Sequence, residues 1–323
     1  MRLRVAFLGV MSLSLLVAFG PLAQAGTVRD DRDPNLYLSL GAQAQYASVG
    51  RLTFTIGTSS YLGSGTLIAK DWVLTAGHCV DQAKTMNFYI GGTNYTAKQW
   101  IANPNWNGDL LRGYDVGLVQ LSKAVTNVAP AARYAGTAEL GKTATIAGYG
   151  MTGTGLTGAT TLDWKKRAGQ NVVDVLYAGL GKDAKILLTD FDNPRNPKDS
   201  AYGSSKPLSL EFMTAPGDSG GGLFIDSKSG PLLAGVTSFG AAYDGKVDSD
   251  YGDIGGYSRV SYYNSWVDSV LRSFLPGKTN VSLADYAPVR AMDAEISLPE
   301  PATLGLLAAG LGGLAWRSRR RRP

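Results

Sequence analysis

Histidine and cysteine are nearly absent from this 323-residue chain, which contains one of each. A single histidine excludes a histidine-rich metal site, and it makes His78 the only imidazole available for proton transfer near neutral pH. A single cysteine, Cys79, excludes any disulfide within the chain. A body of roughly 250 residues can bury enough apolar surface to fold without disulfides.

An excess of basic charge is also missing from the body of the chain. The formal net charge is +5, but residues 1–25 and 299–323 together hold seven basic residues and one acid. The rest of the chain is left with 24 basic and 25 acidic residues. The folded part therefore has no electrostatic signature of a nucleic-acid-binding protein, and we expect no nucleic-acid partner.

Long stretches with helical periodicity are scarce, whereas glycine is abundant, with 41 residues. Residues 51–56 alternate between apolar and polar side chains, as a half-buried strand does. Further short strand-like runs lie at residues 64–68, 72–75, 87–90, 116–121, 143–150, 232–240 and 256–260. Residues 262–274, by contrast, have helical spacing, and Pro276 and Gly277 follow them. We therefore expect an all-β fold with a C-terminal helix.

The first 25 residues have the three parts of a secretory signal peptide. Arg2 and Arg4 precede an apolar stretch at residues 5–19, and Ala-Gln-Ala at residues 23–25 is a small-x-small cleavage site. We expect signal peptidase to cut there, so that the mature chain begins at Gly26. The alternative, a retained membrane anchor, fits less well because the apolar stretch is shorter than the roughly 20 residues that a span needs.

The remaining chain divides into segments by composition. Residues 26–45 are polar and charged and predict an extended leader, and residues 46–275 carry the strand pattern. Within that body, residues 152–161 consist of Thr, Gly, Leu and Ala, which indicates a flexible loop. Residues 276–298 form a predicted linker to the C-terminal segment 299–323.

Three short motifs supply the groups that acyl transfer needs: a nucleophile, a base, an orienting group and oxyanion donors. They are Thr-Ala-Gly-His-Cys at residues 75–79, Tyr-Asp-Val-Gly-Leu at 114–118 and Gly-Asp-Ser-Gly-Gly at 217–221. The glycines around the serine allow a sharp turn and a close approach of substrate. In this order and spacing the motifs resemble the chymotrypsin-like (trypsin-like) serine protease family, from about residue 49 to residue 274.

The resemblance implies a role for each polar residue of these motifs. Ser219 would be the nucleophile, His78 the base and then the acid, and Asp115 the group that orients the imidazole. The backbone N–H groups of Gly217 and Ser219 would form the oxyanion hole. The chain is then expected to be a secreted serine endopeptidase that cleaves protein or peptide substrates through an acyl-enzyme, with no cofactor and no metal.

The resemblance also implies an architecture. The family folds into two packed six-stranded antiparallel β-barrels with the catalytic site in the cleft between them. In this chain the barrels would cover about residues 46–130 and 131–262, followed by a helix at residues 262–274.

Four further residues occupy positions that the family uses to bind substrate. Met213 lies six residues before the serine, at the floor of the specificity pocket, where an acidic residue would select Lys or Arg. Gly240 and Gly255 would form the pocket walls, and Ser238 begins the segment that pairs with the substrate backbone as an added strand. We expect the pocket to prefer an apolar or small P1 side chain.

The sequence departs from the family pattern at two cysteines and at its N-terminus. Gly63 and Ala215 stand where the family usually has cysteines, which removes disulfides but no catalytic group. No Ile-Val-Gly-Gly start occurs within residues 26–52, although in the family the freed amine of that start pairs with the aspartate that matches Asp218. Two alternatives stay open: activity once the signal peptide is removed, or activation by a cut near one of three arginines, Arg29, Arg32 or Arg51.

Two other functions are compatible with the motifs. One is a catalytically idle protease-like module that binds peptide or matrix at the cell surface, which the missing activation start keeps open. The other is a hydrolase that uses the same triad on esters.

The oxygen-rich loop at residues 190–199 has groups that suit Ca²⁺, but its spacing matches no calcium-binding loop and its prolines favour an ordinary polar turn.

The C-terminal segment has a three-part layout. Pro-Glu-Pro at residues 299–301 precedes an apolar run at 302–316 and an arginine cluster at 317–322. This layout resembles the PEP-CTERM sorting signal of Gram-negative bacteria. It implies export through the inner membrane, transient membrane association through a C-terminal helix, and cleavage by an exosortase-like enzyme that leaves the protein secreted or at the cell surface. A permanent tail anchor is the alternative, although about 15 residues barely span a hydrocarbon core.

Overall fold

The computed structural model describes residues 26–179, 181–242, 244–275 and 282–291. The predicted signal peptide, the sorting signal and its apolar run at residues 302–316 lie outside these described residues. Among the described residues, no helix has both the length and the apolar character needed to cross a membrane.

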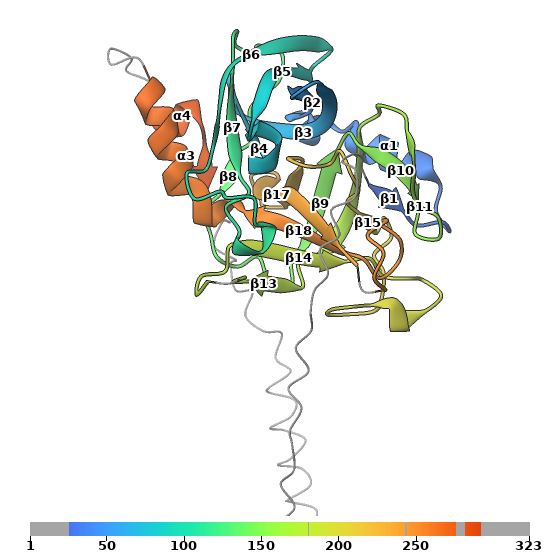
Figure 1. The fold of residues 1–323 in the computed structure, drawn as a ribbon. Coiled ribbons are helices and arrows are strands. Elements are labelled where there is room, and N and C mark those ends of the chain that lie inside the picture. The colour runs from blue at the N-terminus through green and yellow to red at the C-terminus, as the bar shows by residue number, and fades with distance from the viewer. Residues whose placement is uncertain (1–25, 180, 243, 276–281, 292–323) are drawn as a thin grey trace, which may run out of the picture. The chain divides into compact units, whose positions relative to one another are not determined.

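The first unit is a closed barrel of six antiparallel strands, and it confirms the predicted first barrel. Its strands are β2 (Val49–Ile56), β3 (Ser59–Ala69), β4 (Trp72–Thr75), β5 (Ala83–Ile90), β6 (Thr93–Ala102) and β7 (Gly117–Leu121). They close in the order β2-β3-β4-β7-β6-β5. Alternation in β2 places Leu52 and Phe54 inside the barrel, where they pack with Phe88 and Val119. Figure 1 shows this barrel in blue to green.

The second unit is a nine-stranded sheet, of which seven strands pair in the order β12-β9-β16-β17-β18-β14-β13. Its strands are β8 (Arg133–Tyr134), β9 (Thr143–Gly148), β12 (Arg167–Val172), β13 (Val175–Tyr177), β14 (Ile186–Asp190), β16 (Gly222–Ile225), β17 (Leu232–Ala241), β18 (Ile254–Arg259) and β19 (Val289–Arg290). In this order β12 and β14 do not pair with each other. A hydrogen bond from the Asn171 side-chain amide of β12 to the Asp190 carbonyl of β14 links these two strands.

A small third sheet carries the N-terminal end of the described chain. Its order is β11-β10-β1-β15, with β1 (Thr27–Val28), β10 (Met151–Thr154), β11 (Gly158–Leu162) and β15 (Phe212–Met213). In β1, Thr27 pairs with Met213 and Val28 with Phe212. The first described residues of the chain are thereby joined to the segment just before the proposed nucleophile.

The C-terminal helix α3 (Val260–Phe274) packs against β8 and β17 (Figure 1). Its buried residues, Val260, Tyr263, Val267 and Leu271, recur every three or four positions, as an amphipathic helix requires. On the same helix, Phe274 packs on Trp72 of β4, with ring centroids 5.3 Å apart. The helix therefore packs against both the first barrel and the second sheet.

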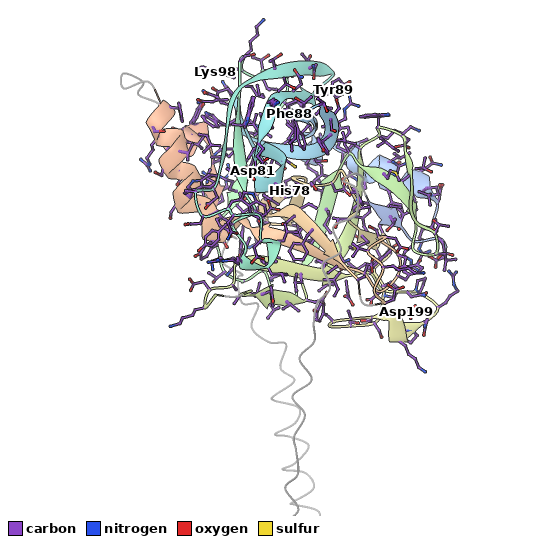
Figure 2. The ribbon with its side chains drawn as sticks, viewed as in Figure 1. His78, Asp81, Phe88, Tyr89, Lys98 and Asp199 are labelled. Atoms are coloured by element: carbon purple, nitrogen blue, oxygen red, sulfur yellow. The ribbon has the colours of Figure 1, made fainter. Side chains whose placement is uncertain are left out.

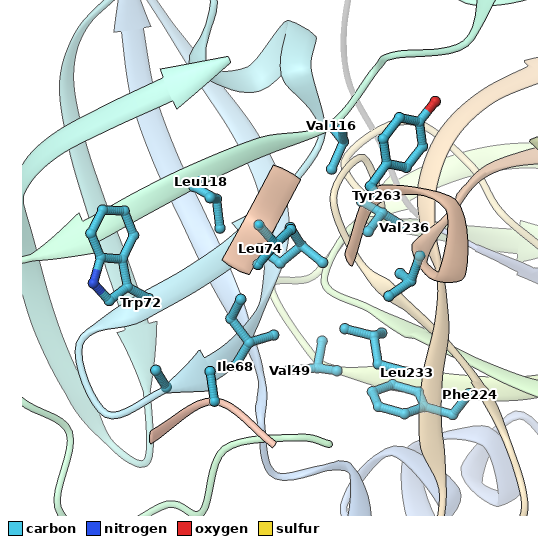
Figure 3. Close-up of a cluster of buried hydrophobic side chains, with 14 of the residues drawn as sticks. Val49, Ile68, Trp72, Leu74, Val116, Leu118, Phe224, Leu233, Val236 and Tyr263 are labelled. Carbon is cyan, nitrogen blue, oxygen red and sulfur yellow. The ribbon is translucent and has the colours of Figure 1, made fainter. Parts of the chain in front are cut away.

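The main core lies where the two sheet systems meet (Figure 3). Val49, Ile68 and Leu74 of the first barrel pack in one cluster with Leu233 and Val236 of the second sheet. Because apolar side chains from both units share this cluster, burial holds together the elements that carry the proposed catalytic residues.

These findings confirm the all-β fold class with a C-terminal helix. Strand β4 has the predicted limits, and α3 begins two residues before the predicted helix. The predicted extended leader at residues 26–45 is wrong, because it contains helix α1 (Pro34–Gly41) and the 3₁₀-helix η1 (Ala44–Tyr46). The Asp33 side chain caps α1 by accepting from the Asn35 N–H, and Pro34 occupies the first turn.

Two other segment predictions are also wrong. Residues 152–161 fall largely within the β10–β11 hairpin instead of a flexible loop. In the predicted linker, residues 282–291 contain α4 (Leu283–Tyr286) and β19, which pairs with β8. Composition did not reveal β19 because its partner β8 is distant in the chain, and it did not reveal the local β10–β11 hairpin because residues 152–161 lack apolar alternation.

Candidate active site

Asp115 is the buried centre of the site. Its carboxylate accepts hydrogen bonds from the His78 backbone N–H (2.8 Å), the His78 Nδ1 (2.8 Å) and the Ser238 hydroxyl (2.5 Å). The side chain of Asp115 is 1% exposed, so water cannot replace these partners. Asp115 lies two residues before the start of β7. The Ser258 hydroxyl of β18 donates a hydrogen bond to the Asp115 carbonyl and fixes the backbone there.

His78 lies in the single helical turn α2 (Gly77–Val80), just after β4, and Figure 2 labels it. Its side chain is 23% exposed, so one edge of the ring can face a substrate. Burial lowers the pKa of His78, but the Asp115 carboxylate, together with Cys79, outweighs burial and holds that pKa well above its ordinary value. With Nδ1 bound to Asp115, Nε2 is the ring nitrogen left for proton transfer.

Ser219 lies in the turn between β15 and β16, at the junction with the first barrel. Its carbonyl accepts from the Ser64 N–H of β3 at 2.8 Å and lies 3.8 Å from the Cys79 sulfur. Because Cys79 follows His78 directly, these contacts bring the proposed nucleophile to the histidine turn. The Ser219 hydroxyl forms no hydrogen bond with the described residues.

The backbone before Ser219 has a conformation that favours glycine. Gly217 has a φ of +97°, which a residue with a side chain rarely adopts. The Gly217 carbonyl is held by the Ser64 hydroxyl at 2.9 Å. Within the described parts of the chain, neither Gly217 nor Ser219 donates its backbone N–H to an acceptor, so both donors are available to a developing oxyanion.

Cys79 is fully buried and faces Gly63, the position at which the sequence lacks a second cysteine. A Cβ on Gly63 would lie 3.3 Å from the Cys79 sulfur and 3.2 Å from the Ser219 carbonyl oxygen. The pair of positions is therefore adjacent in space, as the resemblance implies, and the Cys79 thiol is free and lies 3.8 Å from the Ser219 carbonyl oxygen.

The four predicted substrate-binding residues also gather around β17. A β-bulge between Thr237 and Phe239 leaves Ser238 out of the ladder, so that its hydroxyl reaches Asp115. Gly240 and Gly255 then pair directly across β17 and β18. A Cβ on Gly240 would lie 3.8 Å from the Met213 Cε. Met213, the predicted floor of the specificity pocket, therefore lies next to Gly240, one of its predicted walls.

The structure adds residues that sequence reasoning missed. Met213 forms a buried cluster with Phe191 and Tyr251, whose rings lie 4.6 Å apart. Val247, which is 39% exposed, would come within 3.3 Å of a Cβ on Gly240. These three residues belong to loops with no strand pattern, so only the tertiary structure could place them beside Met213 and Gly240.

Two acids of the oxygen-rich loop at residues 190–199, Asp190 and Asp199, form internal contacts. The Asp190 carboxylate accepts from the backbone N–H groups of Ala201 and Tyr202. The Asp199 carboxylate accepts from the side-chain amides of Asn193 and Asn196. These bonds support the predicted polar turn.

Asp218, next to Ser219, is buried among backbone donors. Its carboxylate accepts from the N–H groups of Ala215, Gly150 and Gly26. Burial raises the pKa of Asp218 to about 6, and these donors oppose that rise. A Cβ on Gly148 would lie 1.9 Å from the carboxylate, so glycine at residue 148 makes room for it.

Two family models match the sequence. The model described as Trypsin matches residues 41–172 and 199–267, together more than half of the chain. The model described as PEP-CTERM protein-sorting motif matches residues 297–321.

Individual proteins show the same similarity. Chymotrypsin from Phaedon cochleariae is 26% identical over 257 residues, which cover 73% of this chain and 83% of that protein. Chymotrypsin-like elastase family member 1 from Felis catus is 28% identical over 255 residues, which cover 71% and 83%. The solved structure of neuropsin, a serine protease expressed in the limbic system of mouse brain, has a TM-score of 0.53 and 19% identity, covering 72% of this chain and 97% of that chain. At this identity the structural similarity supports the fold alone.

Proposed function

The chain belongs to the trypsin family of serine endopeptidases, and from this premise we propose that it is an exported enzyme that hydrolyses peptide bonds with Ser219, His78 and Asp115. The observation that carries the proposal is the buried Asp115 carboxylate, which binds the His78 ring, the His78 backbone and Ser238 at once. A histidine held only for packing would not need a buried charged partner whose desolvation is costly.

The proposed reaction has two steps. His78 takes the proton of the Ser219 hydroxyl while the oxygen attacks the substrate carbonyl, and the oxyanion receives hydrogen bonds from the N–H groups of Gly217 and Ser219. The peptide C–N bond then breaks, and His78 returns its proton to the leaving amine. Water repeats the same sequence on the acyl-enzyme and frees Ser219. Throughout, Asp115 stabilises the protonated imidazole.

For specificity we propose an apolar or small P1 side chain. Support comes from Met213, which is buried with Phe191 and Tyr251 and offers no carboxylate to a basic side chain. Gly240 and Gly255 add no side chains of their own to the proposed pocket walls. The thioether and aromatic surfaces favour desolvation of an apolar group.

We further propose that the protein works outside the cytoplasm of a Gram-negative bacterium. The match to the PEP-CTERM motif at residues 297–321 supports processing by an exosortase-like enzyme. The signal peptide at residues 1–25 and the transient membrane association of residues 302–316 belong to the same proposal, and both segments lie outside the described residues.

The proposal is tested by covalent labelling of the chain from residue 26 to residue 323 with a fluorophosphonate probe. We expect labelling of the wild type and its loss in Ser219→Ala and His78→Ala. Turnover of amide substrates distinguishes a peptidase from the ester hydrolase. A folded wild-type chain that neither labels nor cleaves peptide would favour the idle binding module instead.

A further inference from the structure

We propose that Arg51, held between the rings of Tyr89 and Trp164, forms a subsite for an acidic side chain of the substrate, on the side of Ser219 where the leaving peptide lies. This inference rests on the proposed function, and it adds a second specificity to the pocket around Met213. The ligand is a carboxylate, carried by Glu or Asp two to four residues after the scissile bond.

The first observation is that the charge of Arg51 has no partner. The other buried or half-buried arginines of the described residues each bind a carboxylate: Arg29 binds Asp31, Arg133 binds Asp268, Arg167 binds Asp163 and Arg259 binds Glu139. Arg51 is half-buried, yet it forms neither an ion pair nor a hydrogen bond with a described residue. An unpaired cation is costly to bury, so an incoming anion would supply the compensation that the fold does not.

The second observation is the aromatic support of this cation. The Arg51 guanidinium carbon lies 4.9 Å from the centroid of the Tyr89 ring and 5.1 Å from that of Trp164, and Figure 2 labels Tyr89 on β5. The Arg51 Nε is buried without a hydrogen-bond partner, whereas the terminal nitrogens are not buried. The rings hold the guanidinium plane without neutralising its charge, so the outer edge is ready for a bidentate carboxylate.

Trp164 reaches this position through an unusual backbone conformation. Its φ is +63°, which a large residue rarely adopts, and its side chain is 50% exposed. The preceding acid, Asp163, already accepts two hydrogen bonds from Arg167, at 2.8 and 2.7 Å. The turn therefore brings an aromatic ring to Arg51 and leaves its charge unpaired.

The third observation is the face of the barrel on which Arg51 lies. Arg51 pairs directly with Tyr89 of β5 and with Ser64 of β3, so these three side chains share one face of the sheet. On that face the Ser64 hydroxyl donates to the Gly217 carbonyl and accepts from the Tyr149 N–H. Arg51 therefore lies on the face against which the turn with the proposed nucleophile packs.

Tyr149 lies between Arg51 and this turn. Burial and Tyr89 raise the pKa of Tyr149, and the Arg51 guanidinium opposes that rise, so the phenol and the guanidinium are electrostatic neighbours. The backbone of the same residue bonds the Ser64 hydroxyl. Tyr149 thus connects the subsite to the reaction centre.

The half of the substrate that meets Arg51 follows from the two neighbours of Ser219. The Gly220 N–H donates to the Thr237 carbonyl of β17, and the Ser64 N–H of β3 donates to the Ser219 carbonyl. The acyl half of the substrate is proposed to pair with β17, so the leaving half lies toward β3 and its neighbour β2. Two strand spacings place the Arg51 backbone on the order of 10 Å from Ser219, about three residues of extended chain.

The experiment uses the chain from residue 26 to residue 323 and peptides with Phe at P1. The parent peptide has Gln at the second, third and fourth residues after the scissile bond, and three others each replace one Gln by Glu. Two quantities are measured: the ratio of kcat/KM for each Glu peptide to that for the parent, and the affinities of the inactive Ser219→Ala variant for the same peptides by calorimetry. The second quantity does not depend on catalysis.

We expect Glu to raise kcat/KM and affinity about tenfold at one or more of the three positions. Arg51→Gln should bring both ratios to about 1, and Arg51→Lys should retain only part of the preference because it keeps the charge and loses the planar fork. Trp164→Ala should also lower the ratios. Arg272→Gln removes an exposed arginine of α3 and should keep the wild-type values.

Urea unfolding shows whether each variant is folded, and Arg51→Lys and Trp164→Ala carry the test if Arg51→Gln is not. Equal rates and affinities for Gln and Glu peptides in a wild-type chain that cleaves them would overturn the subsite and leave the proposed function intact. A preference that persists in folded Arg51→Gln would also overturn it. A chain that cleaves none of the peptides would overturn the proposed function, and the affinities would then test the carboxylate subsite alone.

Discussion

At the scale of single residues, Asp115 organises the site by accepting three hydrogen bonds within a water-free environment. It holds His78 in the tautomer that leaves Nε2 free, and it holds Ser238 out of the β17 ladder. One buried carboxylate thus positions both His78, the proposed base, and Ser238, a proposed substrate-binding residue.

Removal of the proposed nucleophile gives the largest expected effect. Ser219→Ala should lower kcat by roughly 10⁶, about 8 kcal/mol of barrier, because no other group in the site can form the acyl-enzyme. Steady-state kinetics on a peptide substrate measures this loss. Ser204→Ala, which changes an exposed serine, serves as the control and should match wild type. Activity of Ser219→Ala within tenfold of wild type would rule out the triad.

The pH profile tests the coupling of His78 to Asp115. The base must be neutral, so kcat/KM should be low in acid and rise as pH passes the raised pKa of His78, with a midpoint above 6.5. Asp115→Asn removes the negative charge that raises this pKa, so the midpoint should move to lower pH while the rate falls by about 10⁴. Asp226→Asn is the matched control. An unchanged midpoint in Asp115→Asn would contradict the assignment.

Met213 provides a test of specificity. Wild type should cleave reporters with Phe or Leu at P1 faster than a reporter with Arg, and Met213→Asp should shift the ratio of kcat/KM values toward Arg. Met213→Asn controls for polarity without charge. Faster cleavage of the Arg reporter by wild type would show that the pocket is not apolar.

At the scale of elements, helix α3 packs against both the first barrel and the second sheet. Leu271 is fully buried on its apolar face, so Leu271→Ala should reduce the free energy of unfolding by about 2–5 kcal/mol. Ser269→Ala on the exposed side should change it by less than about 0.5 kcal/mol. Urea unfolding of both variants measures the difference. Equal stability of the two would mean that α3 is not part of the cooperative core.

At the scale of the whole molecule, stability should fall as pH rises from 5 to 8. Burial raises the pKa values of Asp192 to about 7, Glu211 to about 8 and Asp253 to about 8. Between the ordinary carboxyl pKa near 4 and these values, the folded state binds more protons than the unfolded state, so unfolding becomes easier as pH rises. The raised pKa of His78 acts in the same direction.

Urea unfolding at several pH values measures this slope. Each group contributes at most about 1.4 kcal/mol per pH unit. Glu211→Gln should flatten the dependence, because the amide oxygen can still accept from the Leu208 N–H without titrating. Asp226→Asn should leave the slope unchanged. A free energy of unfolding that rises from pH 5 to pH 8 would contradict this assignment.

The sequence by itself determined the fold class, the order of the three motifs and the strands with clear alternation, because each depends on residues close together in the chain. Through the resemblance to the family, it also led us to propose His78, Asp115 and Ser219 as the triad and to propose the four substrate-binding candidates. It did not reveal α1, which packs on β12, or β19, which pairs with β8, because both partners lie far away in the chain. It also missed the local β10–β11 hairpin, because residues 152–161 lack apolar alternation. Composition alone makes such segments look like loops.

Only the tertiary structure decided which distant residues meet. It brought Phe191, Tyr251 and Val247 to the pocket region from loops without periodicity, and it set Gly26 against Asp218 across nearly two hundred residues. The physical reason is that burial and charge compensation act between groups that are close in space, whereas a sequence pattern records only what is close along the chain.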